Sequence, residues 1–304
     1  MVQLAYKLHQ VTHNTTTIKG ITNETLTPGI EQYVMQGGGS LDPFNIVTEK
    51  ADQKASFITE DLKVALDLSF LTPLAITSGA LGKMYFRKLA DGGVYAGAND
   101  ILVTINKGMM YLKSISAKQF GHAAAQYEIL PTFDGTNVPL LVTNASTAPT
   151  LERDTVLWGL GNLIINSTDI PNNSMDFDAG INVKPEGSKG YLFNTECFTI
   201  SRNPMFTFQN FDLSRLIAAG ISPLVGATST GNVVVTLRKF TIGGGTHVAD
   251  ATEEHIKFTM TGAAITPTEI VGNSGALATI GLVIKPVYDG SNSLIAIDTT
   301  AAAT

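Results

Sequence analysis

The sequence repeats one series of short motifs about 150 residues apart. In each half an Asp-Leu pair is followed by a Pro-Leu pair, then by two basic residues, and last by an Asp-Gly pair. The separations between the copies are 151, 150, 151 and 155 residues in that order, so few residues were inserted. A period of this size is that of a domain, far above the 20–50 residues of solenoid repeats. We therefore predict two like domains in tandem, residues 1–147 and 148–304. The motifs begin at Asp61 and Asp212, Pro73 and Pro223, Arg87 and Arg238, and Asp134 and Asp289.

Composition supports two domains and limits the classes of partner. The chain has 304 residues, of which 44% are hydrophobic, enough for a core in each half. Only 15% are charged, against about 25% in an ordinary soluble domain. A surface so poor in charge indicates extensive contact with partners. The formal net charge is −6, so no basic surface is available to grip a phosphate backbone, and specific nucleic-acid binding is not expected.

Cysteine usage and apolar runs indicate folding in a cytoplasm. The single cysteine, Cys197, excludes an intrachain disulfide framework and is expected to be a buried small apolar residue. The first seven residues lack the basic start and apolar run of a signal peptide. The longest apolar stretches, such as residues 276–284, are shorter than the roughly 20 residues that span a bilayer. We expect no membrane association.

Strand signals dominate both halves, and each half has one helix signal. β-Branched and aromatic runs separated by Gly-rich turns predict strands covered on both faces, in a sandwich or an assembled wall. Thr59 is expected to cap a helix over residues 61–70, and Asn210 one over residues 212–219. The acidic residues of the first turn fit the positive end of the helix dipole better than a catalytic role. The predicted strands include 101–105, 127–130, 233–237 and 256–260; the residues expected to face inward are Leu62, Leu66 and Phe70, and Leu213, Leu216 and Ile217.

The segments before each helix and the end of each half carry distinct signals. Residues 33–55 and 175–203 are too long for tight turns and too apolar for solvated linkers, so we expect partner-contacting loops. Residues 134–137 and 289–292 predict hairpin turns, because glycine accepts positive φ. A calcium loop is disfavoured there, since no bidentate Glu follows at the required distance. The boundary between the domains is expected near residues 144–152.

No motif for chemistry is present in the sequence. The five histidines are scattered without metal-ligand spacing, and a glycine pair at Gly159 and Gly161 lacks the third glycine of a dinucleotide fingerprint. No nucleophile elbow and no phosphate-binding loop occur. We therefore predict no catalytic, cofactor-binding or metal-ligating residue, and a protein that is not an enzyme. The histidines are His9, His13, His122, His247 and His255.

The first half resembles the tail tube proteins of long-tailed bacteriophages. The resemblance is carried by residues 27–31, by a long loop leading to Phe57, Thr59, Asp61 and Leu62 with their short helix, and by the closing turn at residues 134–137. The second half keeps the helix and closing turn and departs in the loop before the helix. The resemblance implies a mainly β fold of two tandem tail-tube-like β-sandwich domains, each with one short helix and a long loop.

The resemblance also implies a function and partners. In that family six domains form a ring, their inner sheets join into a barrel around a channel for DNA, and rings stack into a tube. Two fused domains then predict rings of three chains with approximate six-fold symmetry. The expected partners are further copies of the chain and the tail terminator, tape measure and baseplate proteins of a virion tail, while DNA passes through the lumen without specific binding and no cofactor is needed.

Two other readings stay open at the level of the sequence. One is another ring component of the tail, a terminator or baseplate protein with the same fold. The other is a two-domain β-sandwich binding or adhesin module, which predicts exposed aromatic residues on one face. The only tryptophan, Trp158, lies between Leu157 and Leu160 and is expected to be packed, which favours the first class.

Overall fold

The computed structural model is mainly β, as predicted. It describes residues 5–36, 43–89, 99–149, 156–188, 190–210, 213–229, 232–241, 246–271, 279–288, 290–291 and 293–303. The elements of the first half are β1 (Ala5–His13), β2 (Thr16–Ile18), β3 (Ile21–Thr27), β4 (Ile30–Gln36), β5 (Pro43–Ala51), β6 (Lys54–Thr59), α1 (Leu62–Leu68), β7 (Leu74–Ile76), β8 (Gly82–Leu89), β9 (Asp100–Ile105), β10 (Gly108–Lys118), β11 (Ala124–Pro131) and β12 (Leu141–Ser146).

The second half has the same elements in the same order. They are β13 (Trp158–Ile165), β14 (Thr168–Ile170), β15 (Ser174–Asp178), β16 (Ile181–Gly187), β17 (Asn194–Arg202), β18 (Met205–Asn210), α2 (Leu213–Ala218), β19 (Ala227–Ser229), β20 (Val233–Lys239), β21 (His255–Met260), β22 (Ala263–Val271), β23 (Thr279–Pro286) and β24 (Ala296–Ala301). Each strand of the first half therefore has a counterpart twelve strands later.

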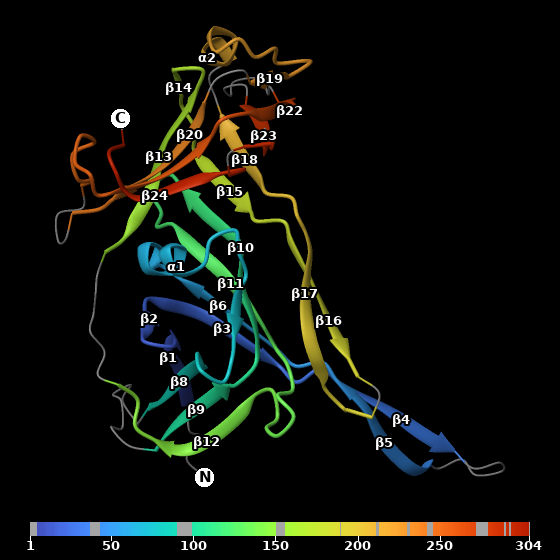
Figure 1. Ribbon diagram of the computed structural model, residues 1–304. Helices are drawn as coiled ribbons and strands as arrows, with labels where there is room; N and C mark the ends of the chain where they lie inside the picture. The colour runs from blue at the N-terminus through green and yellow to red at the C-terminus, as the bar shows by residue number, and fades with distance from the viewer. Residues whose placement is uncertain are drawn as a thin grey trace.

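The pairing of the strands is repeated as well. The first-half sheet has the order β12-β9-β8-β1-β2, and the second-half sheet has the corresponding order β24-β21-β20-β13-β14. A third, shared sheet runs through both halves in the order β3-β6-β11-β10-β15-β18-β23-β22-β19, with β7 also paired to β10. The hairpins β4–β5 and β16–β17 extend away from these sheets on the same side (Figure 1).

Unusual backbone conformations recur at matching positions. Asn14 and Asn166 have φ of 53° and 48° in the turns that follow β1 and β13. Gly29 and Gly180 have φ of 55° and 56° where the two long hairpins begin. A Cβ at Gly29 would overlap the carbonyl oxygen of Asp52, and one at Gly180 would overlap that of Asn203. Glycine is required at both places because only it combines positive φ with so close an approach.

The core of each half lies between its own sheet and the shared sheet. Burial alternates along β6, where Ala55, Phe57 and Thr59 point inward, as expected for a sheet with one buried face. Trp158 is 2% exposed, so the prediction that it is packed is confirmed. Helix α1 covers the first-half core with Leu62 and Leu66.

Tyr127 holds α1 against the shared sheet. Its ring stacks on Phe57 with centroids 5.5 Å apart. Its hydroxyl lies 2.8 Å from the carbonyl oxygens of both Ala65 and Ser69 and shares its single proton between them, at the C-terminal turn of α1. Burial raises the pKa of this phenol, so it stays a neutral donor.

The predicted helices exist, with corrections to their ends. The residue before α1 is Asp61, which makes no side-chain cap, so the prediction that Thr59 caps the helix is wrong. The Thr59 hydroxyl instead accepts from the Asp61 amide at 3.0 Å and donates to the Lys19 carbonyl at 2.6 Å, because Thr59 lies two residues before the cap position. Phe70 lies beyond α1. Helix α2 ends at Ala218, one residue before the predicted end, and Gly220 follows it with φ of 80°; Asp212 lies outside the described residues.

Ile217 does not face inward, contrary to the prediction. It is 61% exposed, whereas its counterpart in α1, Leu66, is 2% exposed. The difference follows from the neighbours of the two helices. Helix α1 packs against β24 of the second half, whereas the main neighbour of α2 among the described residues is its own β14.

The two segments predicted as long loops are hairpins. Residues 33–55 fall largely in β4 and β5, and residues 175–203 in β15, β16 and β17. Both faces of β16 and most of β17 are accessible to solvent, so the burial signal that marks a core strand is missing. An isolated hairpin of this kind is marginal in water, which indicates that it needs support from a neighbour.

The closing turn is a turn, but not a hairpin. The Asp134 carboxylate accepts from the amides of Thr136 and Asn137 at 2.8 and 2.7 Å, and Gly135 has φ of 100°. Its flanking strands belong to different sheets, however, because β11 pairs with β10 and β6 while β12 pairs with β9. The turn therefore crosses from the shared sheet to the first-half sheet. Asp289 and Asn292 of the second copy lie outside the described residues.

Replacing Tyr127 with phenylalanine tests the anchoring of α1. We expect Tyr127→Phe to lower the free energy of unfolding by about 1–2 kcal/mol, because the Ala65 and Ser69 carbonyls lose the buried phenolic donor that they share and Ala65 keeps only the Ser69 amide. Urea denaturation of the unassembled chain measures this. Tyr33→Phe is the matched control, since Tyr33 is 54% exposed, and equal stability of the two variants would contradict the expected role.

Candidate assembly interface

The two halves are joined by main-chain pairing within the shared sheet. β10 of the first half pairs antiparallel with β15 of the second half from Ser114 opposite Asp178 to Lys118 opposite Ser174. In the middle of this internal seam Ile115 lies opposite Phe177, and both are buried. The lower part of the same edge of β10, from Gly108 to Met110, pairs with β7. One edge of β10 therefore pairs with two strands, with β7 near its start and with β15 near its end.

Aromatic packing reinforces the internal seam. Phe70, which follows α1 in the first half, lies with its ring centroid 5.7 Å from Phe177 and 5.6 Å from Phe258 of the second half. Phe177 also packs on Phe206 at 4.5 Å. The first half thus inserts a side chain into the core of the second.

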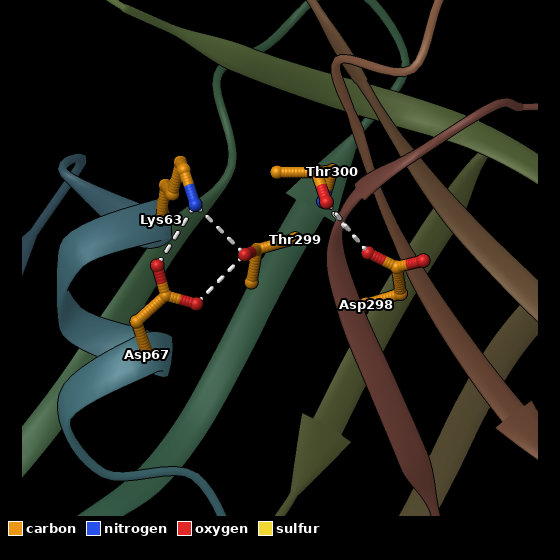
Figure 2. A network of polar contacts seen from close by, with 5 residues as sticks. All are labelled: Lys63, Asp67, Asp298, Thr299 and Thr300. Carbon is orange, nitrogen blue, oxygen red and sulfur yellow. Dashed lines mark hydrogen bonds and ion pairs between the residues drawn. The ribbon is translucent and has the colours of Figure 1, made fainter.

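A polar network joins α1 to β24 across the same junction. Lys63 Nζ donates to Asp67 Oδ2 at 2.8 Å and to Thr299 Oγ1 at 2.9 Å, and Thr299 Oγ1 donates to Asp67 Oδ1 at 2.7 Å (Figure 2). We call these three residues the polar clamp. Beside it the Asp298 carboxylate accepts from the amide and hydroxyl of Thr300, which fixes the strand end. Because Lys63 and Asp67 are 43% and 49% exposed, the clamp orients the junction more than it stabilises it.

The second-half hairpin crosses onto the first half at its base. Asn194 accepts from the Phe133 amide at 2.8 Å and donates to Asp52 Oδ1 at 2.7 Å. Lys107 Nζ reaches Glu196 Oε1 at 2.7 Å. The Phe133 ring lies 5.1 Å from that of Tyr191. Each of these contacts joins a residue of one half to a residue of the other.

Beside these contacts a groove stays open between the halves. It has a volume of about 840 Å³ and is lined by residues 66–74 of the first half and by Arg202, Tyr288 and residues 293–295 of the second. Arg202 Nη1 crosses it to the Leu71 carbonyl at 3.3 Å.

The ends of the shared sheet present the two edges that the internal seam uses. β3, the counterpart of β15, is the last strand at one end. At the other end β22, the counterpart of β10, pairs with β19 at Ala263–Ile265 as β10 pairs with β7. From Thr266 to Val271 this edge of β22 has no partner strand among the described residues. Unpaired backbone on a strand edge is a template for another strand.

Exposed apolar side chains mark both ends. Ile270 on β22 and Leu26 on β3 are 41% and 38% exposed. By the repeat they correspond to Ile115 and Phe177, which the internal seam buries. Other exposed apolar residues at the second-half end are Ile217, Leu224 and Val225, and at the first-half end Val138 and Val142.

The open face of the shared sheet is polar. Paired residues share a face, so the registers of β10, β11, β15, β18 and β22 place small uncharged side chains together on the side away from the core. Charges of both signs are interspersed on this face, including Lys54, Lys118, Glu128, Asp176, Asp178 and Lys285, and apolar side chains such as Ile58 and Val283 share it. The uncharged residues include Thr25, Ser56, Ser114, Ser116, Gln126, Ser174, Thr207, Gln209 and Thr266.

The histidines and the cysteine occupy ordinary structural positions. His9 and His13 lie on β1, with ring nitrogens 3.2 Å from the Pro149 carbonyl and 3.3 Å from the Ala75 carbonyl. Cys197 is half-buried, and burial raises the pKa of its thiol to about 11, so it is protonated near neutrality. Within the described ranges, His, Cys, Asp and Glu form no cluster of three or more suited to a metal ion. None of the helices in those ranges has the length and apolar character that crossing a bilayer requires.

Comparison with known proteins adds no family. No protein-family model matches this chain, and no curated protein matches it. The interpretation of the site therefore depends on the geometry.

Phe70 offers a test of the internal seam. We expect Phe70→Ala to lower the free energy of unfolding by about 3 kcal/mol, because the substitution removes an aromatic ring that packs on two others. Phe120→Ala, at a residue that is 99% exposed, should change stability by less than about 0.5 kcal/mol. Urea titrations of both variants decide this, and a small effect at Phe70 would show that the seam does not depend on the cluster.

Proposed function

We propose that the chain is the structural subunit of a phage tail tube, built as two copies of one domain and assembled into stacked rings. The observation that carries this is the internal seam together with the two unpaired edges. The chain joins its own halves head to tail through β10 and β15, and it presents the same two kinds of edge, β22 and β3, at its ends.

Repeating the internal seam between chains gives a register. Ile270 of one copy then lies opposite Leu26 of the next, as Ile115 lies opposite Phe177. Such a contact is heterologous, so it closes into a ring or continues as a filament. The resemblance to tail tube proteins, in which six domains complete a ring, favours closure by three chains. The shared sheets would then form one continuous barrel without exposed edges.

The open face of the shared sheet suits a conduit for DNA. In the ring this face would line the channel. Its small hydroxyl and amide side chains and its mixed charges give no concentrated positive patch, so few phosphate contacts would form. A polyanion could slide along such a wall without being held.

The hairpins supply surfaces for stacking. Residues of β4–β5 on both strands are apolar and exposed, among them Tyr33 and Val47, which lie opposite each other at 54% and 44% exposure. The second hairpin exposes Phe198 and Ile200. Apolar area on a projecting hairpin is expected to be covered by a partner, and a neighbouring ring would cover it. The tape measure, terminator and baseplate proteins of the tail would contact the lumen and the ends of the tube.

A charge at the chain–chain seam tests ring formation. We expect Leu26→Asp to prevent trimers and tubes, because the carboxylate would be buried opposite Ile270. Thr25→Asp is the matched control. It places the same charge one residue away on the open face, where the internal seam already has Asp176, so assembly should persist.

Native mass spectrometry and negative-stain microscopy of both variants give the result. Tubes from Leu26→Asp as readily as from the wild-type chain would refute the seam, and an unmodified chain that stays monomeric at all concentrations would refute the proposed function.

Stacking is tested separately on the first hairpin. Replacing Tyr33 and Val47 with serine and threonine should leave trimeric rings that no longer form tubes, since the substitutions lie outside the shared sheet. Glu31→Gln, on the same hairpin, should stack normally. Sedimentation separates rings from tubes, and long tubes from the double variant would show that these two residues do not contact the next ring.

A further inference from the structure

The base of the first hairpin is covered by the second half. The hairpin β16–β17 lies against it (Figure 1). The Ala51 amide donates to the Leu192 carbonyl at 2.9 Å, and the Phe133 amide donates to the Asn194 carbonyl at 2.8 Å. Ala51 and Thr132, which precedes Phe133, are 5% and 2% exposed. Main-chain bonds and burial therefore define this contact.

Backbone hydrogen bonds identify the corresponding surface of the second half. Two main-chain bonds recur in both halves, one beside the closing turn and one at the base of the hairpin. Ala51 therefore corresponds to Arg202, and Phe133 corresponds to Tyr288. The recurring bonds run from the amides of Thr132 and Asp52 to the carbonyls of Lys107 and Gly29, and from the amides of Val287 and Asn203 to the carbonyls of Gly262 and Gly180.

The corresponding surface has no such cover in a single chain. Val287 and Tyr288 are 46% and 62% exposed. Arg202 and Tyr288 line the open groove of about 840 Å³. Among the described residues β17 pairs only with β16, so no segment lies along the base of the second hairpin as β16–β17 lies along the first. The groove therefore marks the place of a missing contact.

The first hairpin has the dimensions of the segment that is missing. β4 and β16 begin and end a constant 151 residues apart, as do β5 and β17. The two hairpins therefore match residue for residue, and Pro43 at the start of β5 corresponds to Asn194. In the internal contact Asn194 accepts through its main-chain carbonyl, a group that proline keeps.

Charged residues change in pairs between the internal contact and its counterpart. Ala51 forms an isolated bridge with Phe193. Their counterparts, Arg202 and Asp42, have opposite charges; Asp42 lies outside the described residues. Two polar pairs of the internal contact are both replaced by residues without charge, so no charge is left without its partner. These are Lys107 with Glu196, replaced by Gly262 and Asn45, and Asp52 with Asn194, replaced by Asn203 and Pro43.

We propose that the first hairpin of a second copy of this chain occupies the groove, with the start of its β5 beside Arg202 and Tyr288. The proposal rests on the ring proposed above, in which β3 of that copy pairs with β22. The Tyr288 amide then donates to the Pro43 carbonyl of the second copy, and Arg202 faces Asp42. Each chain thus closes the groove of its neighbour with the hairpin that its own second half repeats.

A pair of cysteines tests the contact in a Cys197→Ser background. Tyr288→Cys with Pro43→Cys should give disulfide-linked dimers and trimers on mild oxidation, and neither substitution alone should do so. Phe133→Cys with Asn194→Cys is the matched control. It places the same pair of positions within one chain, so it should close an intrachain disulfide without oligomers. Non-reducing electrophoresis separates these products.

Charge reversal tests the contact without a cross-link. Arg202→Glu should raise the protein concentration for half-assembly at least about tenfold, because it places like charges opposite each other. Adding Asp42→Arg should restore assembly. The unfolding midpoint of the unassembled Arg202→Glu chain should stay close to that of the wild type, since the side chain is exposed. The control Lys184→Glu, on the same hairpin but outside the groove, should form trimers normally.

The outcomes separate this contact from the function of the tube. Trimers that cross-link but never stack would support the groove contact and overturn the tail tube function. Tubes that form without the cross-link, while the control pair closes within the chain, would overturn the groove contact and leave the tube function standing. Assembly of Arg202→Glu at wild-type concentrations would also overturn the groove contact.

Discussion

The main-chain pairing of β10 with β15 is the contact on which the rest of the structure depends. A strand edge carries a row of N–H and C=O groups that are unsatisfied unless another strand pairs with them. The internal seam satisfies one such edge inside the chain and brings Phe70, the polar clamp and the base of the second hairpin into contact with the opposite half. The same constraint applies to β3 and to residues 266–271 of β22, which is why we propose a second copy of the chain as the partner.

The sequence predicted local structure better than the relations between distant segments. The helices near Asp61 and Asp212 and the strands around residues 101–105 and 233–237 follow from short-range signals, and the structure confirms them. The sequence predicts loops in place of the two hairpins because their strands lack a buried face. It predicts a hairpin at residues 134–137 because turn chemistry is local, whereas the choice of partner strand is not.

The contact between the two halves was the feature that the sequence predicted least well. Nothing in the residues of β10 or β15 specifies that these two strands pair with each other. Their pairing depends on how the two halves of the chain are placed relative to each other. The exposure of Ile217 could not be predicted from helical spacing either, because its counterpart Leu66 has the same spacing and is buried. One signal was present in the sequence. The second half departs from the first after its helix, and a close comparison of residues 69–74 with residues 220–227 would have revealed a longer, more apolar turn.

In the proposed ring, the fusion of the halves accounts for a difference in chemistry between the internal junction and the junction between chains. A covalent linker raises the effective concentration of one half beside the other, so the internal junction needs little further stabilisation. Exposed polar contacts such as the clamp then suffice to set its geometry, and a groove stays open beside it in the single chain. Two separate chains must overcome the loss of translational and rotational freedom on association, which requires well-packed apolar area. Ile217, Leu224 and Val225 are exposed at that end of the chain, where the internal junction has Leu66 and the first-half turn. In the proposed assembly, divergence between the halves would therefore place apolar surface at the junction between chains, which has no linker.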